Sequence, residues 1–479
     1  MAAEVKPIPA AHAYPSEEEN LREQLMFDPL PREEMNRMVM EAMTETTPKY
    51  WIVVGILSVV VAVCLFGLWG YEIFTGVGTS GERRPTYWGM WIVTFVFWIG
   101  ISHAGTFVSA ILRVFKAEFR RPFTRAAELM TTFGLLGGAL YPLIHLGRVW
   151  VFYWMIPYPN QRWLWPNFRS PLEWDLMAIT TYLLSSTIYL YLPLLPDLAM
   201  ARDRTTGWRN AFFKTLALGW RGTEAEWFRL KTGINIFAFA IIPVMFSVHT
   251  IVSWDFAVSQ TAGWNSTIFG PYFIVGAILS GVSAVITILI VLRWTMKHMT
   301  YFLRPEHIDA LGKLVLIFSM AWAYFFFNDY LVTWYGGYGV QRQLLTLHAS
   351  GPTAWVWYSM LVFNIVIPWL ILWNKKWRRT PWLMFLVTIG INIGMYFERY
   401  TIIPMTLAHQ RLPFDWGQYS PRLTDTGIPI GTFAFFILLY LLASRLIPLI
   451  PVWEVREGQE SHIVRKIGKT HVPSISDLD

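Results

Sequence analysis

The stretch FIVGAILSGVSAVITILIVL at residues 273–292 contains no charged side chain. A helix of about 20 residues rises about 30 Å, which matches the hydrocarbon core of a lipid bilayer. Similar apolar runs lie on both sides of it, separated by turn-forming and charged segments such as GTSGERRP, PYPNQRW and NKKWRRTP. The pattern predicts an all-α, polytopic membrane protein with spans near 50–76, 87–115, 126–157, 172–195, 233–259, 268–297, 311–334, 353–374, 381–402 and 428–450.

Composition supports a membrane protein. The chain has 479 residues, of which 54% are hydrophobic and 15% are charged, so a soluble domain could not hide its apolar surface. Cys64 is the single cysteine, which excludes a disulfide framework or a thiolate-ligated cluster built from this chain alone. The net charge of +7 comes from basic residues spread over several loops, which does not favour a nucleic-acid partner.

The basic loops predict the orientation in the membrane. Lys and Arg concentrate in alternate connections, at KAEFRRPFTR, from ARDRTTGWRN to Lys231, at 293–313 and at NKKWRR. By the positive-inside rule these loops and both termini are cytoplasmic. Residues 1–49 are polar and lack a cleavable signal, so we expect a soluble cytoplasmic arm.

A weak internal repeat predicts the grouping of the spans. Arg121-Pro122 in the first half corresponds to Arg304-Pro305 in the second. Ser170-Pro171 before the fourth span corresponds to Gly351-Pro352 before the eighth. Two four-helix bundles with flanking helices would follow. The expected division is an arm at 1–49, a first span and outer loop at 50–86, a first bundle at 87–259, a second bundle at 260–402, a last loop and span at 403–455 and a cytoplasmic tail at 456–479.

Ionisable residues in or beside these spans are the candidate functional groups, because a charge inside a bilayer is costly. The strongest local pattern is YPLIHLGR at 141–148 followed by PNFRSPLEWD at 166–175. His145 lies roughly 28 Å along the third span, and Asp175 opens the fourth, so both should lie near the outer surface. Imidazole and carboxylate could together accept the hydroxyl protons of a quinol. A structural His–Asp pair between two helices explains the spacing equally well.

Further polar residues could form a proton route. His249 and Asp255 in SVHTIVSWDFA are six residues apart, which places them on opposite sides of an ideal helix. They could be successive stations, with Asp329 and Glu398 contributing from the second bundle. For Asp255, Asp329 and Glu398, contact with a neighbouring helix or the interface is at least as good an explanation. His103 lies deeper in the second span, where a structural hydrogen bond is favoured over a proton relay.

Several motifs resemble a known family. HAGTFVSAILR at 103–113, YPLIHLGR and PNFRSPLEWD resemble the quinone-reactive membrane subunits of the polysulfide reductase and nitrite reductase membrane-anchor family. The polar arm, the ten spans, SVHTIVSWDFA and the loop ALGWRGTEAEWFRLKTG together resemble the C subunits of bacterial alternative complex III. The resemblance covers roughly 50–455.

The resemblance implies a function and a set of partners. It implies two four-helix bundles in a bacterial inner membrane, with a quinol site near the outer face of the first. His145 and Asp175 would be the catalytic quinol contacts, joined by Arg148 and Phe168 in the binding site. Menaquinol or ubiquinol would be the substrate, with no haem or iron–sulfur cluster in this chain. Lipid, an outer iron–sulfur protein, a second related ten-helix subunit and cytochrome c subunits would be the partners.

Three other functions remain open on the sequence. A dihaem cytochrome would also place histidines in helices, but it needs pairs that face each other across a bundle. A secondary transporter is supported by the repeat and by proline-interrupted spans such as IIPVMF at 241–246. A purely structural anchor for a soluble redox partner is the third possibility.

Overall fold

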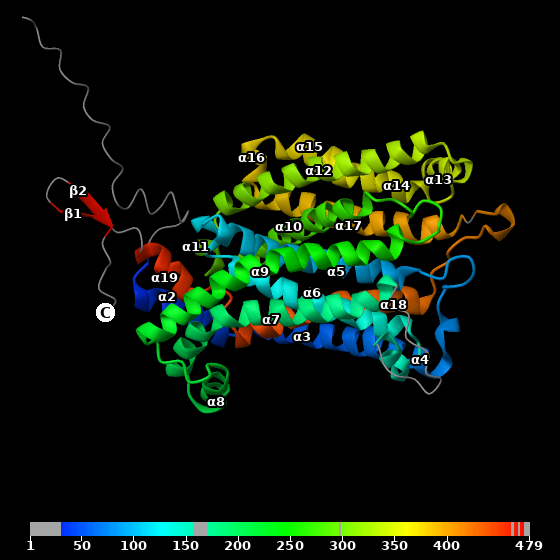
Figure 1. Ribbon diagram of the computed structural model, residues 1–479. Coiled ribbons are helices and arrows are strands. Elements are labelled where there is room, and N and C mark those ends of the chain that lie inside the picture. The colour runs from blue at the N-terminus through cyan, green and yellow to red at the C-terminus, as the bar shows by residue number, and fades with distance from the viewer. Residues whose placement is uncertain are drawn as a thin grey trace, which may run out of the picture.

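The computed structural model describes residues 30–156, 170–296, 298–409, 411–460, 464–467 and 470–473. Within these ranges ten helices are long and apolar enough to cross a membrane, so the prediction of an all-α protein with ten spans is confirmed. Their axes lie roughly side by side (Figure 1). The spans are α3–η1–α4 (Pro48–Thr75), α5 (Met90–Val114), α6 (Thr124–His145), α7 (Pro171–Asp203), α9 (Glu224–Ala257), α10 (Phe269–Thr295), α12 (Pro305–Gly336), α14–η5–α15 (Ala354–Leu372), α17–η6 (Pro381–Met405) and α18 (Leu423–Leu446).

Shorter elements connect the spans. Most of them lie at the two ends of the helical bundle (Figure 1). They are α2 (Arg32–Thr44), η2 (Val77–Thr79), η3 (Glu118–Arg120), η4 (Val149–Met155), α8 (Gly207–Leu216), α11 (Met299–Phe302), α13 (Gly339–Ser350), α16 (Lys375–Arg378), η7 (Pro413–Asp415), α19 (Val452–Glu460) and the antiparallel strands β1 (Val464–Ile467) and β2 (Thr470–Pro473).

The largest departures from the predicted limits are in the third, fourth and fifth spans. The third ends at His145 rather than 157, because Gly147 adopts a φ of +65° and the chain then turns into η4. The fourth continues to Asp203 with two prolines inside it, which membrane helices tolerate. The fifth begins at Glu224, where the side chain of Thr223 caps the helix. An apolar run predicts only the part of a helix that lies within the bilayer. It does not show where the helix continues into polar turns outside the bilayer.

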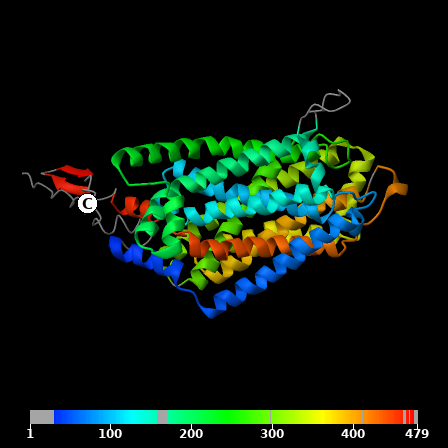
Figure 2. The same ribbon diagram turned by 90° about the horizontal axis from the view of Figure 1, so that it is seen from below.

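The spans pack in two groups around a central contact. Helices α5, α6, α7 and α9 pack on one another, and α10 packs on α12 and α17, which in turn contacts α14. The first span borders α18, and in Figure 2 this pair lies along one edge while α9 lies along the opposite one. The expected domain limits remain an interpretation of this arrangement.

The two groups meet where α5 and α10 approach closely. A Cβ atom at Gly281 of α10 would lie 2.1 Å from the Cβ of Ala104 in α5, so only glycine fits there. A Cβ atom at Gly105 would lie 2.2 Å from the carbonyl oxygen of Ala127 in α6. Small residues therefore allow α5 to contact both neighbours at backbone distance, as is common between membrane helices.

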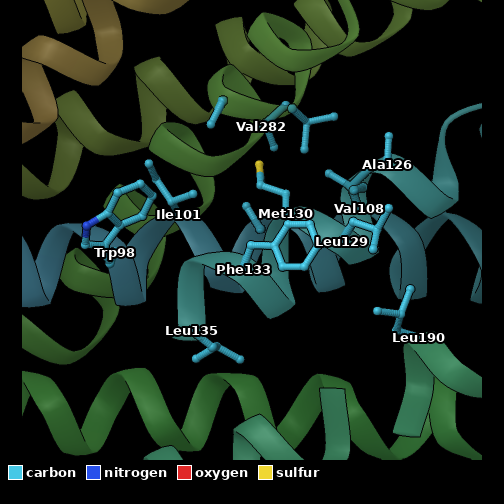
Figure 3. Close-up of a cluster of buried hydrophobic side chains, with 14 of the residues drawn as sticks. Trp98, Ile101, Val108, Ala126, Leu129, Met130, Phe133, Leu135, Leu190 and Val282 are labelled. Carbon is cyan, nitrogen blue, oxygen red and sulfur yellow. The ribbon is translucent and has the colours of Figure 1, made fainter. Parts of the chain in front are cut away.

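Large apolar side chains fill the space between α5, α6 and their neighbours. Trp98, Met130 and Phe133 lie between these helices, and Val282 reaches the same cluster from α10 (Figure 3). The indole N–H of Trp98 donates to Thr432 Oγ1 of α18 at 3.2 Å, so the polar atom of this buried ring is satisfied. Dispersion contacts rather than exclusion from water hold such a core together inside lipid.

The described parts of both terminal regions lie at the same end of the bundle. Helices α2 and α19 lie at one end, here called the inner end, and α13 lies at the other, the outer end (Figure 1). The loops 76–89 and 406–422 also lie at the outer end. Which end faces the cytoplasm is still the prediction made from the basic loops.

Candidate functional site at the outer end of the first helix group

His145 is the last residue of α6 and its ring is 30% exposed. The ring Nδ1 lies 3.1 Å from Glu82 Oε2 in the loop between α4 and α5, without the alignment of a directed hydrogen bond. The other carboxylate oxygen of Glu82 accepts the backbone N–H of Gly89 at 2.8 Å. Trp91 packs edge-on to the His145 ring at 6.5 Å between centroids. The contact with Glu82 favours an imidazole that carries a proton on Nδ1.

Two further acids lie beside this contact. Glu72 of α4 is fully buried, and neither of its carboxylate oxygens has a hydrogen-bond partner. Asp425 at the start of α18 is also fully buried. Its Oδ2 accepts the backbone N–H groups of Gly81 and Arg422 at 2.6 and 2.7 Å, and its Oδ1 is unpaired. We call Glu72, Glu82 and Asp425 the outer acid cluster.

Glycines bring the outer loops against the end of α6. A Cβ atom at Gly147 would lie 2.4 Å from Val77 Cγ1 and 3.8 Å from Glu72 Oε1. The positive φ of Gly147 therefore lets the turn after His145 pack directly on the loop that carries Glu82. A Cβ atom at Gly89 would lie 2.4 Å from the hydroxyl of Tyr419, which accepts the N–H of Met90.

Asp175 lies one turn into α7 and contacts Asp255 near the end of α9. The two carboxyl groups lie within interaction distance of each other, and Oδ1 of each has no hydrogen-bond partner. Two carboxyl groups in contact can share one proton, which removes the repulsion between like charges. Trp174 and Trp254 pack edge to face beside the pair, with ring centroids 6.0 Å apart. We call these two acids the Asp pair.

The expected contact between His145 and Asp175 is not formed. Among the described residues, no hydrogen bond or ion pair joins them, because the His145 ring lies toward loop 76–89 whereas Asp175 lies toward α9. Arg148 is exposed in the turn that follows α6. Phe168 lies outside the described residues. The sequence pattern correctly placed both groups at the ends of neighbouring helices but not their carboxylate partners.

His103 and His249 lie together in the buried interior. Their ring centroids are 4.7 Å apart, and Tyr182 stacks on His103 at 4.5 Å. His103 Nδ1 donates to the carbonyl of Ile99 at 2.5 Å, which leaves its Nε2 as the proton-accepting nitrogen. The carbonyls of Met245 and Phe273 lie near the two rings without alignment, so His103 Nε2 and both nitrogens of His249 lack a directed hydrogen bond.

Polar side chains continue from this pair toward the inner end. The hydroxyl of Tyr182 donates to the carbonyl of Ser102, and Thr106 donates to Thr131 at 3.1 Å. Ser109 then donates to Glu128 Oε1 at 2.7 Å and lies 3.2 Å from the hydroxyl of Tyr189. Glu128 is 3% exposed, and its second carboxylate oxygen is unpaired. These side chains form a polar column inside the first helix group.

Glu398 and Arg399 form a buried ionic contact in the second group. Arg399 Nη1 lies 2.9 Å from Glu398 Oε2, and the indole of Trp322 donates to Glu398 Oε1 at 2.7 Å. The Arg399 guanidinium lies 4.6 Å from the centroid of Phe273, whose ring also contacts His249. Phe273 therefore separates the histidine pair from the ionic contact.

Asp329 contacts the loop between α9 and α10. Its Oδ1 accepts the hydroxyl of Ser266 at 3.0 Å. Asp329 and Glu398, which the sequence suggested as groups of a proton route, therefore both have structural partners. Asp329 contacts Ser266, and Glu398 contacts Trp322 and Arg399.

A second set of buried charges fastens α19 at the inner end. Glu454 of α19 lies 2.7 Å from Arg120 and 3.7 Å from Arg113, and its carbonyl accepts Arg121 at 2.6 Å. Burial alone would raise the pKa of Glu454, but the guanidinium groups of Arg113 and Arg120 outweigh it and lower the pKa to about 2. The carboxylate is therefore ionised at neutral pH and holds the helix in place.

Sequence reasoning missed four acids of these clusters. The sequence could have indicated two of them, Glu72 and Glu128. Both fall in or beside apolar runs, where an ionisable side chain requires a reason. The missed acids are Glu72, Glu82, Glu128 and Asp425.

Across the described residues, no group of three or more His, Cys, Asp or Glu side chains is arranged so that it could hold a metal ion.

The sequence is similar to known membrane proteins of oxidoreductase complexes. It is 23% identical to a membrane subunit proposed for the dimethyl sulfoxide reductase of Halobacterium salinarum, over 84% of this chain and 92% of the relative. It is 23% identical to the integral membrane subunit of an Hdr-like menaquinol oxidoreductase of Archaeoglobus fulgidus, over 86% and 96%. It is 25% identical to the integral membrane subunit of a menaquinone reductase of Nitratidesulfovibrio vulgaris, over 84% and 92%.

These names bear on the expected resemblance. The three relatives are named as membrane subunits of different oxidoreductases, and none is named as a subunit of an alternative complex III. The comparisons therefore support the broad family and not the specific resemblance to the C subunits of alternative complex III. The model of the family described as polysulphide reductase, NrfD, matches residues 78–409, which is more than half of the chain. The chain therefore belongs to the NrfD polysulphide reductase family of membrane proteins.

Proposed function

We propose that this chain is the quinol-oxidising membrane subunit of a multisubunit oxidoreductase, acting at the outer end of its first helix group. The observation that carries the proposal is the partly exposed His145 ring in contact with Glu82. A hydroxyl proton can be accepted at the exposed side of such a ring while the carboxylate stabilises the resulting imidazolium. Two relatives named for menaquinol and menaquinone chemistry support a quinone as the substrate.

Asp175 is the second proposed quinol contact. It opens α7 at the same end of the molecule at which α6 closes, and its contact with Asp255 would let the pair share a proton, which supports a role in holding and releasing one. A quinol loses two protons and two electrons, so two acceptors at the two helix ends match its chemistry. Arg148 and Phe168 remain proposed members of the binding site on the resemblance alone.

The electrons must leave to another protein. We propose an iron–sulfur protein docked at the outer end, in a complex that also holds cytochrome c subunits and a second related ten-helix subunit, as in alternative complex III. The direction of the reaction is part of this proposal, because one relative is named as a menaquinol oxidoreductase and another as a menaquinone reductase. In the same proposal the chain lies in a bacterial inner membrane with both termini cytoplasmic.

Proton movement through the first helix group is a separate part of the proposal. The His103–His249 pair has unpaired ring nitrogens between the Asp pair and the polar column that ends at Glu128. Side chains that can accept and donate in turn are what a proton relay requires. Asp255 would be its outer station, and Glu398 and Asp329 would be side stations in the second group.

The same histidine pair argues against a haem. Ring centroids 4.7 Å apart leave no room for a porphyrin and its iron between two axial imidazoles. The pair therefore supports a proton relay better than a cytochrome site.

Turnover of the assembled complex tests the proposal. His145→Ala and Asp175→Asn should each lower quinol oxidation by about 10²-fold or more, since positioned proton acceptors contribute roughly that much. His409→Ala is the matched control, because His409 also lies in the outer loops, where its ring donates to the carbonyl of Met405 and packs on Trp416, away from the outer acid cluster. Measuring quinone reduction on the same samples fixes the direction. Near-normal turnover of an assembled His145→Ala, Asp175→Asn double variant would remove the assignment.

A further inference from the structure

We propose that the proton taken up at His145 leaves through Glu82 and the rest of the outer acid cluster, between the first and last spans, rather than through Asp175. This inference rests on the proposed function and adds to it a proton outlet with three named acids. The proton on His145 has no direct route to Asp175, because among the described residues no hydrogen bond or ion pair joins the two side chains. The structure instead gives His145 a carboxylate at 3.1 Å in loop 76–89.

Glu82 is held in place as a relay group should be. Its side chain is 8% exposed, and Gly89 N–H fixes one oxygen at 2.8 Å while the other lies toward His145. The loop cannot retreat easily, because Gly147 and Gly89 each bring backbone into direct contact with a neighbouring side chain. The His145–Glu82 contact is therefore set by packing and does not depend on a flexible side chain.

Glu72 gives the second step. It is fully buried with two unpaired carboxylate oxygens, and it lies beside the turn that follows His145. A buried carboxyl group without a hydrogen-bond partner is costly, so it calls for a functional reason or an ordered water. A proton that arrives from Glu82 would supply the missing donor.

Asp425 and Tyr419 connect the cluster to the surface. Asp425 Oδ1 is unpaired, while its other oxygen is fixed by two backbone N–H groups. The Tyr419 side chain lies near Asp425, and the neighbouring residues Ser420 and Arg422 are exposed. The groups that face Glu82 are thus His145, Glu72, Asp425 and Tyr419.

Oxidation of a quinol releases two protons and two electrons. A quinol hydroxyl transfers its proton to His145 Nε2 as two electrons pass to the iron–sulfur partner, and the oxygen becomes a quinone carbonyl. His145 Nδ1 gives up its proton to Glu82 Oε2, which leaves a neutral ring protonated on Nε2. A flip of the ring then turns the unprotonated nitrogen back toward the quinol. Glu82 then releases a proton through Glu72 and Asp425 to the outer solution, and the second quinol proton leaves by the Asp pair.

The experiment uses the assembled complex with Glu82→Gln, Glu72→Gln and Glu82→Asp. Glu82→Gln should lower kcat by about 10²-fold with little change in KM, because proton transfer and not binding is impaired. Glu72→Gln should lower kcat in the same way. Glu82→Asp, which keeps the carboxylate, should recover most of the rate, and added formate should partly restore Glu82→Gln by carrying the proton. Asp415→Asn is the control, since Asp415 is an outer-loop acid paired with Arg84 outside the cluster.

The outcomes separate this inference from the proposed function. Wild-type kcat in both Gln variants, with an inactive His145→Ala, would overturn the outlet and leave the quinol site in place. A raised KM with unchanged kcat in Glu82→Gln, or no response to formate, would also overturn it, because Glu82 would then be part of the binding wall or a structural group. Normal turnover of His145→Ala would remove both proposals together.

Discussion

Neutralising Glu454 should release α19 from the inner end. The carboxylate is 1% exposed and contacts two guanidinium groups, and its pKa of about 2 lies below the ordinary value of 4.5. That difference corresponds to about 3 kcal/mol of favourable interaction in the docked state. Glu454→Gln keeps the shape of the side chain but removes this interaction and leaves buried Arg120 without its partner, which adds to the cost.

The pH dependence has a definite sign. Because docking lowers the pKa of Glu454, its contribution to stability is complete above about pH 4.5 and is lost as the pH falls toward about 2. The wild-type protein should therefore lose the docking of α19 across this acid range. The Glu454→Gln variant, which has no carboxylate to titrate, should show no such transition from this position.

Hydrogen exchange of the α19 amides measures the effect. A loss of about 3 kcal/mol should speed their exchange at neutral pH by about 10²-fold, if α19 opens as a local unit. Glu45→Gln, an exposed change at the end of α2, is the control and should leave the rates unaltered. A change of less than about threefold in Glu454→Gln would refute the reasoning, because a lost buried ion pair cannot have so small an effect.

Three other predictions follow from the geometry. Gly147→Ala should destabilise the protein by roughly 1–3 kcal/mol, because it adds a clash to a positive φ, whereas Gly55→Ala should not; equal thermal midpoints would contradict this. His249→Ala should lower the protons delivered outside per electron without weakening quinol binding, and unchanged stoichiometry and rate would make it a packing residue. A reporter fused after Asp479 should be active only inside the cell and a tag in 158–171 should be labelled only from outside, and the reverse pattern would place the site on the wrong face.

Apolar length predicts the spans well because it is a local property. Ten runs of about bilayer length became ten helices in the described residues, including the second span, whose interior is almost wholly buried. Helix ends were harder, because they depend on single residues: Gly147 stops α6, and the Thr223 cap starts α9 before the apolar run begins. The fourth span was predicted to end near 195, but α7 continues through Pro193 and Pro196 to Asp203.

The spacing of residues in the sequence did not predict which carboxylate contacts His145. The depth argument placed His145 and Asp175 near one end, because depth follows from counting residues along a helix. Which carboxylate meets His145 depends on how loop 76–89 folds over the end of α6, and this depends on contacts between residues far apart in the chain. Glu82 was read as part of a charged turn, and its role as a partner emerges only from the packing at Gly147.

The central claim is that a quinol is oxidised beside His145 at the outer end of the first helix group. The most direct test is an experimental structure of the assembled complex with a quinone analogue bound. We predict that the analogue's ring oxygen lies within hydrogen-bond distance of the His145 ring, with the iron–sulfur partner on the same face. A quinone head group bound instead in the second helix group, near Glu398 and Arg399, or at the inner end beside α19, would contradict the account.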